Sequence, residues 1–291
     1  MTTDSVRYRP HMTVSGLPAT HAVTVIDEYG QPQPAYIAGE NPLTLYVDKR
    51  EIVTLMTLGT HPELLTLGYL RNQGLISDLE DIVSVQVDWD VNAVAVTTRA
   101  GTAGWDEKLS QRTVTTGCGQ GTVFGRIMDE FDRLRLPQVP LRQSTIYGLL
   151  RNLHAYNEVY RHAGAVHGCA LCAGTEIVSF IEDVGRHNAV DAIAGLMWLD
   201  AIGGEDKIFY TTGRLTSEMV IKVAQMRIPA LLSRSGVTKM GLDLAQKVGV
   251  TMIARAKGRH YLVYSGAENI IYDAMPPPRP GSTDTPAPEL D

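Results

Sequence analysis

Cysteine and long apolar runs are both scarce in this sequence. The 291 residues include three cysteines, an odd and small number that does not suit a disulfide framework. No uninterrupted apolar stretch approaches the roughly 18 to 20 residues of a membrane-spanning helix, and residues 1–7 do not lead into the apolar core of a secretory signal. These absences predict a cytoplasmic protein with reduced thiols and without a membrane partner.

Positive charge is scarce as well. The chain has 26 Lys and Arg against 32 Asp and Glu, which gives a net charge of -6 and a pI near 5.8. Such a chain offers no general basic surface for nucleic acid. It also has no P-loop, and no GxGxxG sequence follows a strand pattern, which disfavours dinucleotide redox chemistry. Any anionic ligand must therefore be bound by a local site.

The composition, with 44% hydrophobic and 20% charged residues, is typical of a folded globular protein. A chain of this length favours two domains. Residues 1–20 are polar without a sustained period, and residues 273–291 form a Pro-rich tail. We expect both ends to be disordered, because neither has enough apolar surface to bury.

Residues 21–137 are predicted to form a small α+β domain, with the loop that carries Cys118 at its end. Strand patterns on either side of Asp48-Lys49-Arg50 indicate a hairpin with a three- or four-residue loop. The capping-box sequence Thr60-His61-Pro62-Glu63 predicts the start of a helix, and Gly74 is placed to end it.

Residues 138–272 are predicted to form a larger α/β domain. An amphipathic helix comes first, with Ile146, Leu149, Leu150 and Leu153 on one face. Strands and helices then alternate, which predicts right-handed crossovers and a mostly parallel sheet. The expected strands cover residues 177–181, 207–211, 230–233, 251–254 and 261–264, and the expected helices cover 188–199, 217–226 and 239–248.

Four loops at the ends of these strands share one composition. Each has a Gly for tight turning and an Arg that suits bidentate binding of phosphate; they cover residues 182–188, 212–217, 233–238 and 255–260. For one loop alone, Gly, Ser and Thr are simply what turns and helix caps require. Ligands of open α/β sheets bind at the carboxyl ends of strands, so four such loops favour a nucleotide or a nucleotide-bearing cofactor. The candidate residues are Arg186, His187, Gly213, Arg214 and Ser235.

Cys118 is the candidate nucleophile. It lies in Thr116-Gly117-Cys118-Gly119, where a glycine on each side makes the segment sterically open. A reactive cysteine must expose its thiolate, and a carrier of persulfide sulfur must reach two different partners. The alternative is a cysteine that happens to lie in a glycine-rich turn.

The other two cysteines suggest a competing site. With Cys118, the residues His167, Cys169 and Cys172 would complete a Cys3His zinc site. A zinc deaminase would need Glu two residues after the His, but that position is Cys169. We therefore expect no metal, and we expect Cys169 and Cys172 to be small apolar residues of a buried element, with His167 as a satisfied polar group beside it.

Several motifs, in order and spacing, resemble the FdhD family of sulfur carriers. They are the Cys118 loop, GAVH at 164–167, EDVGRHNAVD at 182–191, TGRLTSEMVIK at 212–222 and SRSGVT at 233–238, and the resemblance covers roughly residues 35 to 270. It implies a larger domain similar to cytidine deaminase, with three layers, and a homodimer.

The resemblance also implies a function. Family members take sulfur from an IscS-type cysteine desulfurase and transfer it to the molybdenum of the bis-molybdopterin guanine dinucleotide cofactor before insertion into formate dehydrogenase or a related molybdoenzyme. The family's persulfide cysteine falls on Cys118. Its cofactor-binding segment falls on Arg255, Ala256, Lys257, Gly258, Arg259 and His260, where GDP-like recognition is expected.

Two departures from the family pattern bear on the mechanism. Gly121 replaces the second cysteine of the loop, and Gly168 and Cys169 replace the alanines that usually follow the family's His. One thiol still suffices, because the acceptor attacks only the outer sulfur of a persulfide. The chain is therefore predicted to be a sulfurtransferase, with a cofactor-binding chaperone that moves no sulfur as the alternative. Cys169 or Cys172 would have to take over any resolving role.

Overall fold

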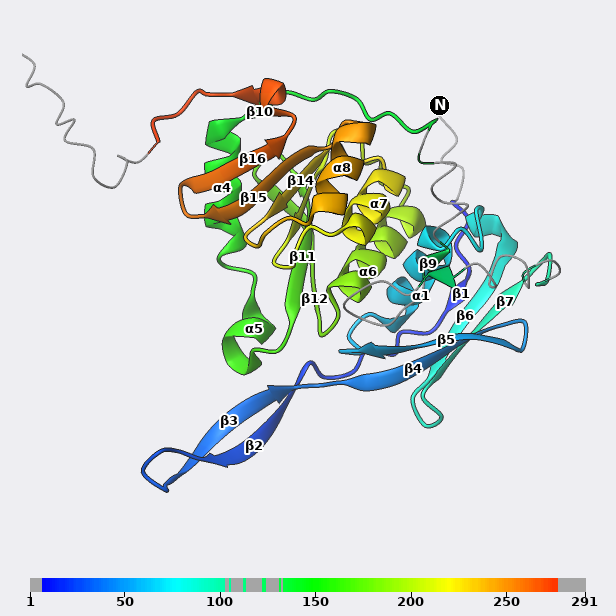
Figure 1. Cartoon of the computed structure of the whole chain (residues 1–291). Coiled ribbons are helices and arrows are strands. Elements are labelled where there is room, and N and C mark those ends of the chain that lie inside the picture. The colour runs from blue at the N-terminus through cyan, green and yellow to red at the C-terminus, as the bar shows by residue number, and fades with distance from the viewer. Residues whose placement is uncertain are drawn as a thin grey trace, which may run out of the picture.

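The computed structural model describes residues 7–102 and 133–276, together with Trp105, Arg112–Thr113, Thr122–Val123 and Phe131. A six-stranded sheet and a five-stranded sheet form the body of the molecule, with helices between them and on the outer face of the larger sheet (Figure 1). Among the described helices, none is both long enough and apolar enough to cross a membrane.

The six-stranded sheet has the order β12-β11-β13-β14-β15-β16. Its strands are β11 (His167–Ala173), β12 (Glu176–Asp183), β13 (Ile208–Thr211), β14 (Ala230–Ser233), β15 (Thr251–Lys257) and β16 (His260–Ser265). Three helices connect them: α6 (Arg186–Leu199), α7 (Ser217–Gln225) and α8 (Lys239–Val248). The predicted helices and strands of this region are confirmed to within a few residues at their ends, and the sequence reading missed β11.

The directions of these strands correct the expectation of a mostly parallel sheet. The β13–β14 and β14–β15 pairs are parallel, but the pairs β11–β12, β11–β13 and β15–β16 are antiparallel. The cause is local, because tight turns at Gly174 and Gly258, both with positive φ, join two of the antiparallel pairs directly. The sheet is therefore mixed.

Alternate residues of the sheet enter two separate cores. Cys169 and Leu171 pack on the side of α6, α7 and α8, whereas Ala170 and Cys172 pack on the side of α4 (Gln143–Leu153). This alternation is what a strand buried on both faces requires. The result is three layers, with α4, the sheet and then α6–α8. The specific likeness to cytidine deaminase stays a prediction.

The five-stranded sheet has the order β1-β6-β7-β4-β5. Its strands are β1 (His11–Met12), β4 (Asn41–Val47), β5 (Arg50–Thr57), β6 (Ile82–Asp88) and β7 (Ala93–Thr98). The hairpin between β4 and β5 is tighter than predicted, because its loop is the two residues Asp48 and Lys49, which both have positive φ. The Asp48 carboxylate accepts hydrogen bonds from the Thr98 amide at 2.9 Å and from its hydroxyl.

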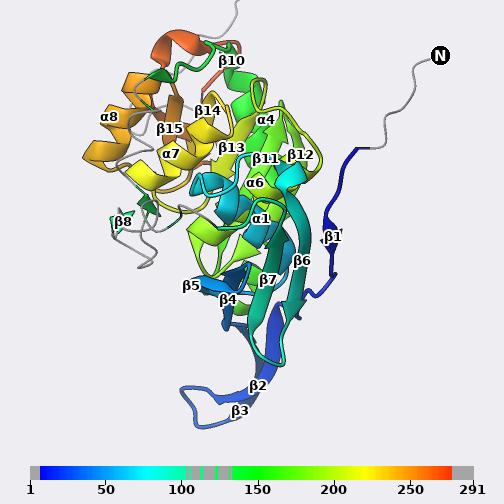
Figure 2. The same cartoon turned by 90° about the vertical axis from the view of Figure 1, so that its right-hand side faces the viewer.

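Helix α1 (Pro62–Asn72) has His61 as its N-cap, without a side-chain capping hydrogen bond, in place of the predicted capping box. Its Glu63 carboxylate accepts hydrogen bonds from the Thr13 hydroxyl at 2.8 Å and the Ser15 amide at 2.9 Å. Figure 2 shows β1 beside β6 at the edge of the five-stranded sheet. Within the N-terminal segment that the sequence predicts to be disordered, β1 and these hydrogen bonds contact the five-stranded sheet and α1.

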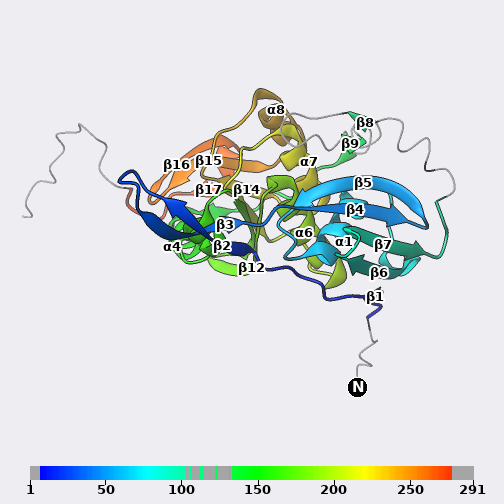
Figure 3. The same cartoon turned by 90° about the horizontal axis from the view of Figure 1, so that it is seen from below.

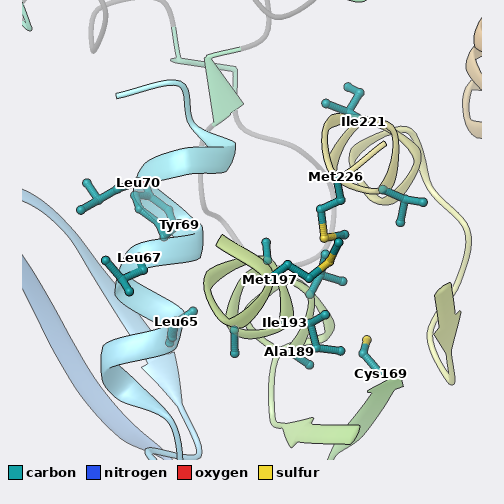
Figure 4. Close-up of a cluster of buried hydrophobic side chains, with 14 of the residues drawn as sticks. Leu65, Leu67, Tyr69, Leu70, Cys169, Ala189, Ile193, Met197, Ile221 and Met226 are labelled. Atoms are coloured by element: carbon teal, nitrogen blue, oxygen red, sulfur yellow. The ribbon is translucent and has the colours of Figure 1, made fainter. Parts of the chain in front are cut away.

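Helices α1 and α6 cross at their glycines. A Cβ on Gly68 would lie 1.7 Å from the Asp191 carbonyl oxygen, and a Cβ on Gly195 would lie 2.0 Å from that of Leu64. Figure 4 shows the side chains of α1, α6 and α7 packed together, with Cys169 of β11 at their base. One hydrophobic core thus continues from the five-stranded sheet to the six-stranded sheet. The domain boundary at residues 137 and 138 stays a prediction.

The remaining elements lie outside these layers. They are β2 (Thr20–Ile26), β3 (Pro32–Ala38), β8 (Arg112–Thr113), β9 (Thr122–Val123), β10 (Leu141–Arg142), β17 (Ile270–Ile271), α5 (Glu158–Ala163) and the short helices Leu79–Asp81 and Ala267–Asn269. Strands β2 and β3 form an arm that extends away from the body (Figures 1 and 2), and Figure 3 shows this arm from below. Near the other end, Asp273, the first residue of the tail predicted to be disordered, accepts a hydrogen bond from the Ser144 amide at 2.9 Å.

Candidate functional site

Four of the predicted cofactor loops meet at one edge of the six-stranded sheet. Strands β12, β13, β14 and β15 run in the same direction, so their carboxyl ends lie side by side. The loops after β12, β13 and β14 lead into α6, α7 and α8, as predicted. The fourth loop differs from the prediction, because it is the hairpin turn between β15 and β16. We call this region the arginine edge, defined by Arg186, Arg214, Arg234 and Arg255.

Hydroxyl groups fix the turns that follow β13 and β14. Thr211 Oγ1 accepts a hydrogen bond from the Gly213 amide at 3.0 Å. Ser233 Oγ donates to the Gly213 carbonyl at 2.7 Å and accepts from the Ser235 amide at 2.9 Å. The two turns are therefore tied to each other, and an additional pairing of Leu215 with Val237 continues beyond them. The sheet edge is a rigid support for side chains that point away from it.

Arg186 is the buried cation of this edge. It is the first residue of α6 and is 5% exposed. Its Nε and Nη2 have no hydrogen-bond partner among the residues that the structure describes. A buried guanidinium without a partner costs several kcal/mol, because it has lost its hydration without gaining compensation. An anion bound at this position would offset that cost, and the planar guanidinium suits a phosphate.

The pKa of the half-buried His167 indicates a positive electrostatic potential at the same edge. Burial lowers its pKa first, and the charges of Arg186, Arg234 and Arg214 lower it further. Arg214 and Arg234 are exposed, in contrast to Arg186. The Arg234 guanidinium lies 5.0 Å from the ring centroid of Tyr160. Three arginines thus surround one neutral imidazole in a chain whose net charge is negative, which is the electrostatic pattern of an anion site.

Arg255 reaches this edge from the fourth loop. Its amide donates to the Ser235 carbonyl at 2.9 Å, and its guanidinium passes within 3.8 Å of the position that a Cβ on Gly236 would occupy. Arg255 has a φ of 54°, which is unusual for a residue other than glycine. This bulged backbone carries an exposed side chain back toward the loop after β14.

These motifs agree with comparisons to known proteins. Residues 38–271 match the model of the FdhD/NarQ family. The chain belongs to the FdhD/NarQ family. It is 30% identical to the sulfur carrier protein FdhD of Listeria monocytogenes, over 80% of this chain and 91% of the relative. It is 29% identical to that of Geobacillus kaustophilus, over 81% of this chain and 90% of the relative.

The fold is similar to that of a solved member. The crystal structure of a protein from Desulfotalea psychrophila, assigned as a formate dehydrogenase accessory protein, matches with a TM-score of 0.68. The two sequences are 28% identical, and the match covers 87% of this chain and 98% of the other. The mixed α/β fold of this chain is therefore shared with that solved structure over most of both chains.

In this FdhD/NarQ protein, the predicted segment Arg255–His260 divides between two places. Arg255 joins the arginine edge, but Ala256 is 2% exposed and packs in the core on the α4 side. The backbone turns at Gly258, between Lys257 and His260, which pair across the hairpin. The methyl group of Ala256 faces the core, so the predicted role of Ala256 in ligand binding could be filled only by its backbone, and it stays a prediction.

Arg259 lies in a groove beside α4. Its guanidinium is 5.0 Å from the ring centroid of Tyr147 and donates to the Met275 carbonyl at 2.6 Å. The groove has a volume of about 760 Å³, and Gly258 also lines it, with Arg151 and His154 of the α4 side. The sequence indicated the cations of the hairpin but gave no sign of the aromatic and basic side chains that α4 supplies.

His187 is in a different environment from the one predicted. It is 1% exposed, and its Nδ1 lies 3.4 Å from Glu218 Oε2 of α7. Burial, and then the charge of Lys222, lowers its pKa to about 2, so the imidazole is neutral. His187 therefore contacts the helix behind the edge, and its contribution to a ligand site is through the position of α6.

Lys222 and Asp191 form a buried ion pair that sequence reasoning missed. The Lys222 ammonium lies 2.7 Å from Asp191 Oδ2 and 3.7 Å from Glu218 Oε1. Asn72 of α1 donates to Asp191 Oδ1 at 2.7 Å. Burial opposes the charge of Lys222, but Asp191 and Glu218 outweigh it and raise its pKa. In the sequence, Glu218 and Lys222 look like an ordinary exposed i, i+4 pair, so only the packing reveals the network.

Asp183 joins the end of β12 to the five-stranded sheet. Its carboxylate accepts hydrogen bonds from the Thr57 hydroxyl at 2.5 Å, the Leu58 amide at 3.0 Å and the Gly185 amide at 2.9 Å. Asn188 also donates to it, at 2.8 Å. This residue of the EDVGRHNAVD motif therefore positions the loop that carries Arg186 and does not face a ligand.

The two cysteines that the structure describes, Cys169 and Cys172, lie in separate places. Cys118, the predicted nucleophile, lies outside the described residues. Cys169 and Cys172 are both buried, and burial raises each pKa to about 12. Their side chains enter the two cores that lie on opposite faces of β11. The two thiols therefore do not share a ligand. The prediction of buried apolar cysteines is confirmed, and among the described residues no group of three His, Cys, Asp or Glu is placed to hold a metal.

Proposed function

We propose that this protein is a cytoplasmic sulfur carrier for the maturation of formate dehydrogenase or a related molybdoenzyme, and that it works as a sulfurtransferase. The observation that carries the proposal is the buried guanidinium of Arg186, whose Nε and Nη2 have no hydrogen-bond partner among the described residues, at an edge with three further arginines. Two of the matching relatives are sulfur carrier proteins by name, which supports sulfur as the group that is moved.

The cargo is the molybdenum bis-molybdopterin guanine dinucleotide cofactor. Its phosphates suit the arginine edge, where Arg186 supplies a buried fork and Arg214 and Arg255 supply exposed cations. The loops that carry Gly213 and Ser235 lead into the N-termini of α7 and α8, where the helix dipole also favours anions. GDP, which has the same guanine nucleotide chemistry, is a practical probe of this site.

The sulfur step takes place at Cys118. Its thiolate attacks the outer sulfur of a persulfide on an IscS-type cysteine desulfurase, and the S–S bond of that persulfide breaks. The desulfurase cysteine leaves as a thiolate, and Cys118 becomes the persulfide, with no net oxidation or reduction. The outer sulfur then passes from the Cys118 persulfide to the bound cofactor: the S–S bond breaks, Cys118 leaves as its thiolate, and the reduced cofactor supplies the two electrons that convert the sulfane sulfur to sulfide.

A chaperone without sulfur transfer is the second candidate. Gly121 removes the usual second thiol of the loop, and Cys169 and Cys172 are too deeply buried to replace it. The arginine edge itself needs no thiol to bind a nucleotide. The two functions therefore differ in whether sulfur passes through Cys118.

One experiment separates the two candidates. The full chain is incubated with cysteine desulfurase and labelled cysteine, persulfides are trapped by alkylation, and the adduct is located by mass spectrometry. We expect label on Cys118, none in Cys118→Ser, and loss of label when the cofactor is added. Binding of GDP with no label on Cys118 would instead identify the chaperone.

A matched pair of variants tests the site. Arg186→Met is expected to lower the affinity for GDP at least tenfold in calorimetry, because it removes the buried fork. Arg227→Met is the control, since this exposed arginine follows α7 at the opposite end of the helix. Equal GDP affinity in the two variants would contradict the assignment of the arginine edge as the cofactor site.

A further inference from the structure

The groove beside α4 has positive charge of its own, apart from the arginine edge. Arg151 and His154 line it from α4, and Arg259 lines it from the β15–β16 hairpin. Both arginines are exposed, and among the residues that the structure describes neither lies within ion-pair distance of a carboxylate. The net charge of the chain is -6, so two arginines without a carboxylate in one groove favour an anionic occupant.

Aromatic rings form another wall of the groove. Tyr147 lines it, and its ring lies 5.9 Å from the ring of Tyr261. The Tyr147 hydroxyl accepts a hydrogen bond from Gln143 Nε2 at 3.0 Å, which fixes the ring in place. Aromatic grooves bind proline-rich segments, because proline packs on the rings and the polyproline helix is already formed before binding. The groove therefore suits a peptide that is both proline-rich and acidic.

The end of the described chain leads directly into this groove. Asp273 accepts hydrogen bonds from the Ser144 amide at 2.9 Å and the Ser144 hydroxyl at 2.8 Å. Ala274 lines the groove, and the Met275 carbonyl accepts a hydrogen bond from Arg259 at 2.6 Å. Pro276 is the last residue that the structure describes at this end. The segment that follows it therefore starts at the groove.

That segment, residues 277–291, has the composition that the groove suits. It continues the proline-rich stretch of residues 276–280, and its acidic residues outnumber its single cation, Arg279. The acidic residues are Asp284, Glu289 and Asp291. The match to the FdhD/NarQ model ends at residue 271, so the segment lies beyond the part of the chain that matches the family.

The length of the segment agrees with the length of the groove. Ser144, which binds Asp273, and Arg151 are separated along α4 by about 10 Å. A flexible chain of eight residues, the number from Pro276 to Asp284, spans about 16 Å on average. Asp284 can therefore reach Arg151, and the residues just after it can reach His154, one helical turn further.

We propose that residues 277–291 bind in the groove beside α4 of their own chain, with the proline-rich stretch against Tyr147 and the Asp284 carboxylate paired with Arg151. The attachment at Pro276 gives the segment an effective concentration in the millimolar range, so a modest affinity is enough to keep it bound. The bound segment closes the groove to other anions, and any ligand that uses Arg259 must displace it. The contact is independent of the arginine edge and of sulfur transfer.

A cross-link in the full chain tests the placement. In a Cys118→Ser background, His154→Cys combined with Thr285→Cys is expected to form a disulfide within one chain under mild oxidation, located by mass spectrometry of the linked peptides. The matched control combines Thr285→Cys with Gln246→Cys, because Gln246 is an exposed residue of α8, on the other face of the sheet. We expect the control to cross-link at least tenfold more slowly. Cys169 and Cys172 are buried and do not compete.

A charge exchange tests the ion pair. Arg151→Glu is expected to slow the cross-link at least fivefold, because it repels Asp284, and Asp284→Arg is expected to do the same by repelling Arg151. The double variant Arg151→Glu/Asp284→Arg is expected to recover the original rate within about twofold. Lys257→Glu is the control, since Lys257 is an exposed cation of the same hairpin that does not line the groove. Its cross-linking rate stays unchanged. Circular dichroism shows whether each variant is folded.

Three results would overturn the proposal. Equal rates for the His154→Cys and Gln246→Cys pairs would mean that the segment has no preferred site on the chain. A disulfide that joins two chains on a non-reducing gel, in place of one within a chain, would assign the groove to the segment of a second copy. A double charge variant that stays as slow as the single variants would mean that Asp284 and Arg151 are not partners.

Discussion

Gly213 and Arg186 lie directly against each other at the edge of the six-stranded sheet. A Cβ on Gly213 would be 2.8 Å from Arg186 Cδ and 3.2 Å from Arg186 Cβ. The position of the buried guanidinium thus depends on the absence of a side chain in the loop after β13, two strands away from β12 in the sheet. The glycine of the TGRLTSEMVIK motif and the arginine of the EDVGRHNAVD motif act as one unit.

The first prediction follows from this contact. Gly213→Ala is expected to lower GDP affinity about tenfold, because the added methyl group displaces the stem of Arg186 and moves its guanidinium. Stability is expected to change by about 1 kcal/mol or less, since a flexible side chain can yield. Isothermal titration calorimetry and thermal unfolding measure the two effects.

Gly236→Ala is the control for this prediction. Its Cβ would lie 3.8 Å from the Arg255 guanidinium, an ordinary van der Waals distance. Its GDP affinity is therefore expected to stay within about twofold of the wild type. If Gly213→Ala binds GDP as tightly as Gly236→Ala, the contact with Arg186 has no part in ligand binding.

The second prediction concerns the crossing of α1 and α6. Gly68→Ala would place its Cβ 1.7 Å from the Asp191 carbonyl oxygen, which is backbone and cannot rotate away. The helices must separate, so we expect a loss of about 3 kcal/mol or more in the free energy of unfolding. Urea titration followed by circular dichroism measures it.

Gly148→Ala in α4 provides the comparison. Its Cβ would meet Thr175 Cγ2 at 2.7 Å, but a threonine side chain can shift, and alanine gains up to about 1 kcal/mol of helix propensity over glycine. The net change is expected to stay within about 1 kcal/mol. Equal losses at Gly68 and Gly148 would mean that the α1–α6 crossing tolerates expansion.

Local sequence patterns were sufficient to predict most helices and strands of the second half. The apolar periods and the helix caps set α6, α7, α8, β13 and β14 within one or two residues of their observed ends. Strand β11 was missed, because HGCALCA is buried on both faces and has no alternation of polar residues. Because β11 was not predicted, its antiparallel pairing with β12 and with β13 was not predicted either.

The candidate site was predicted only in part. The shared direction of four strands allowed the arginine edge to be anticipated, and Arg234 could have been included by the rule that selected Arg214. The buried state of His187 and of Lys222 could not be anticipated, because it depends on how α7 packs against α6 and α1. Contacts between elements far apart in sequence leave no periodic signal.

The third prediction tests the buried ion pair. Lys222→Met removes the ammonium that lies 2.7 Å from Asp191 Oδ2 and leaves a carboxylate with no cation in the core. Loss of one partner of a buried pair typically costs about 3 to 5 kcal/mol, and we expect a loss of this size in urea unfolding at neutral pH. The double variant Lys222→Met/Asp191→Asn is expected to recover part of it.

Lys239→Met is the surface control. Lys239 also pairs with a carboxylate, that of Asp243, but its side chain is 83% exposed. Exposed pairs contribute less than about 1 kcal/mol. A Lys222→Met variant as stable as Lys239→Met would show that the buried pair is replaceable by apolar packing.

The fourth prediction concerns the two buried thiols. Cys169 and Cys172 have pKa values raised to about 12 by burial, so almost no thiolate is present at neutral pH. In the native Cys118→Ser variant, iodoacetamide is expected to leave both unmodified over an hour, and to modify both after unfolding in urea. Mass spectrometry follows the adducts. Rapid labelling of either thiol in the native protein would restore it as a candidate resolving cysteine.

The fifth prediction is a dependence of stability on pH through His187. Burial and the charge of Lys222 lower the pKa of His187 from 6.5 to about 2. The unfolded chain therefore binds a proton near pH 6.5 that the folded chain does not. Stability contributed by the neutral imidazole is complete above pH 6.5 and is lost as the pH falls toward about 2.

The comparison of two histidine variants isolates this effect. Between pH 6 and pH 5 the wild type is expected to lose about 1 kcal/mol more than His187→Gln in the free energy of unfolding, because the variant has no such proton to bind. His162→Gln, which alters an exposed histidine of α5, is expected to keep the wild-type slope. Urea titrations at the two pH values measure the difference, and parallel slopes for His187→Gln and the wild type would mean that His187 is already protonated in the folded protein.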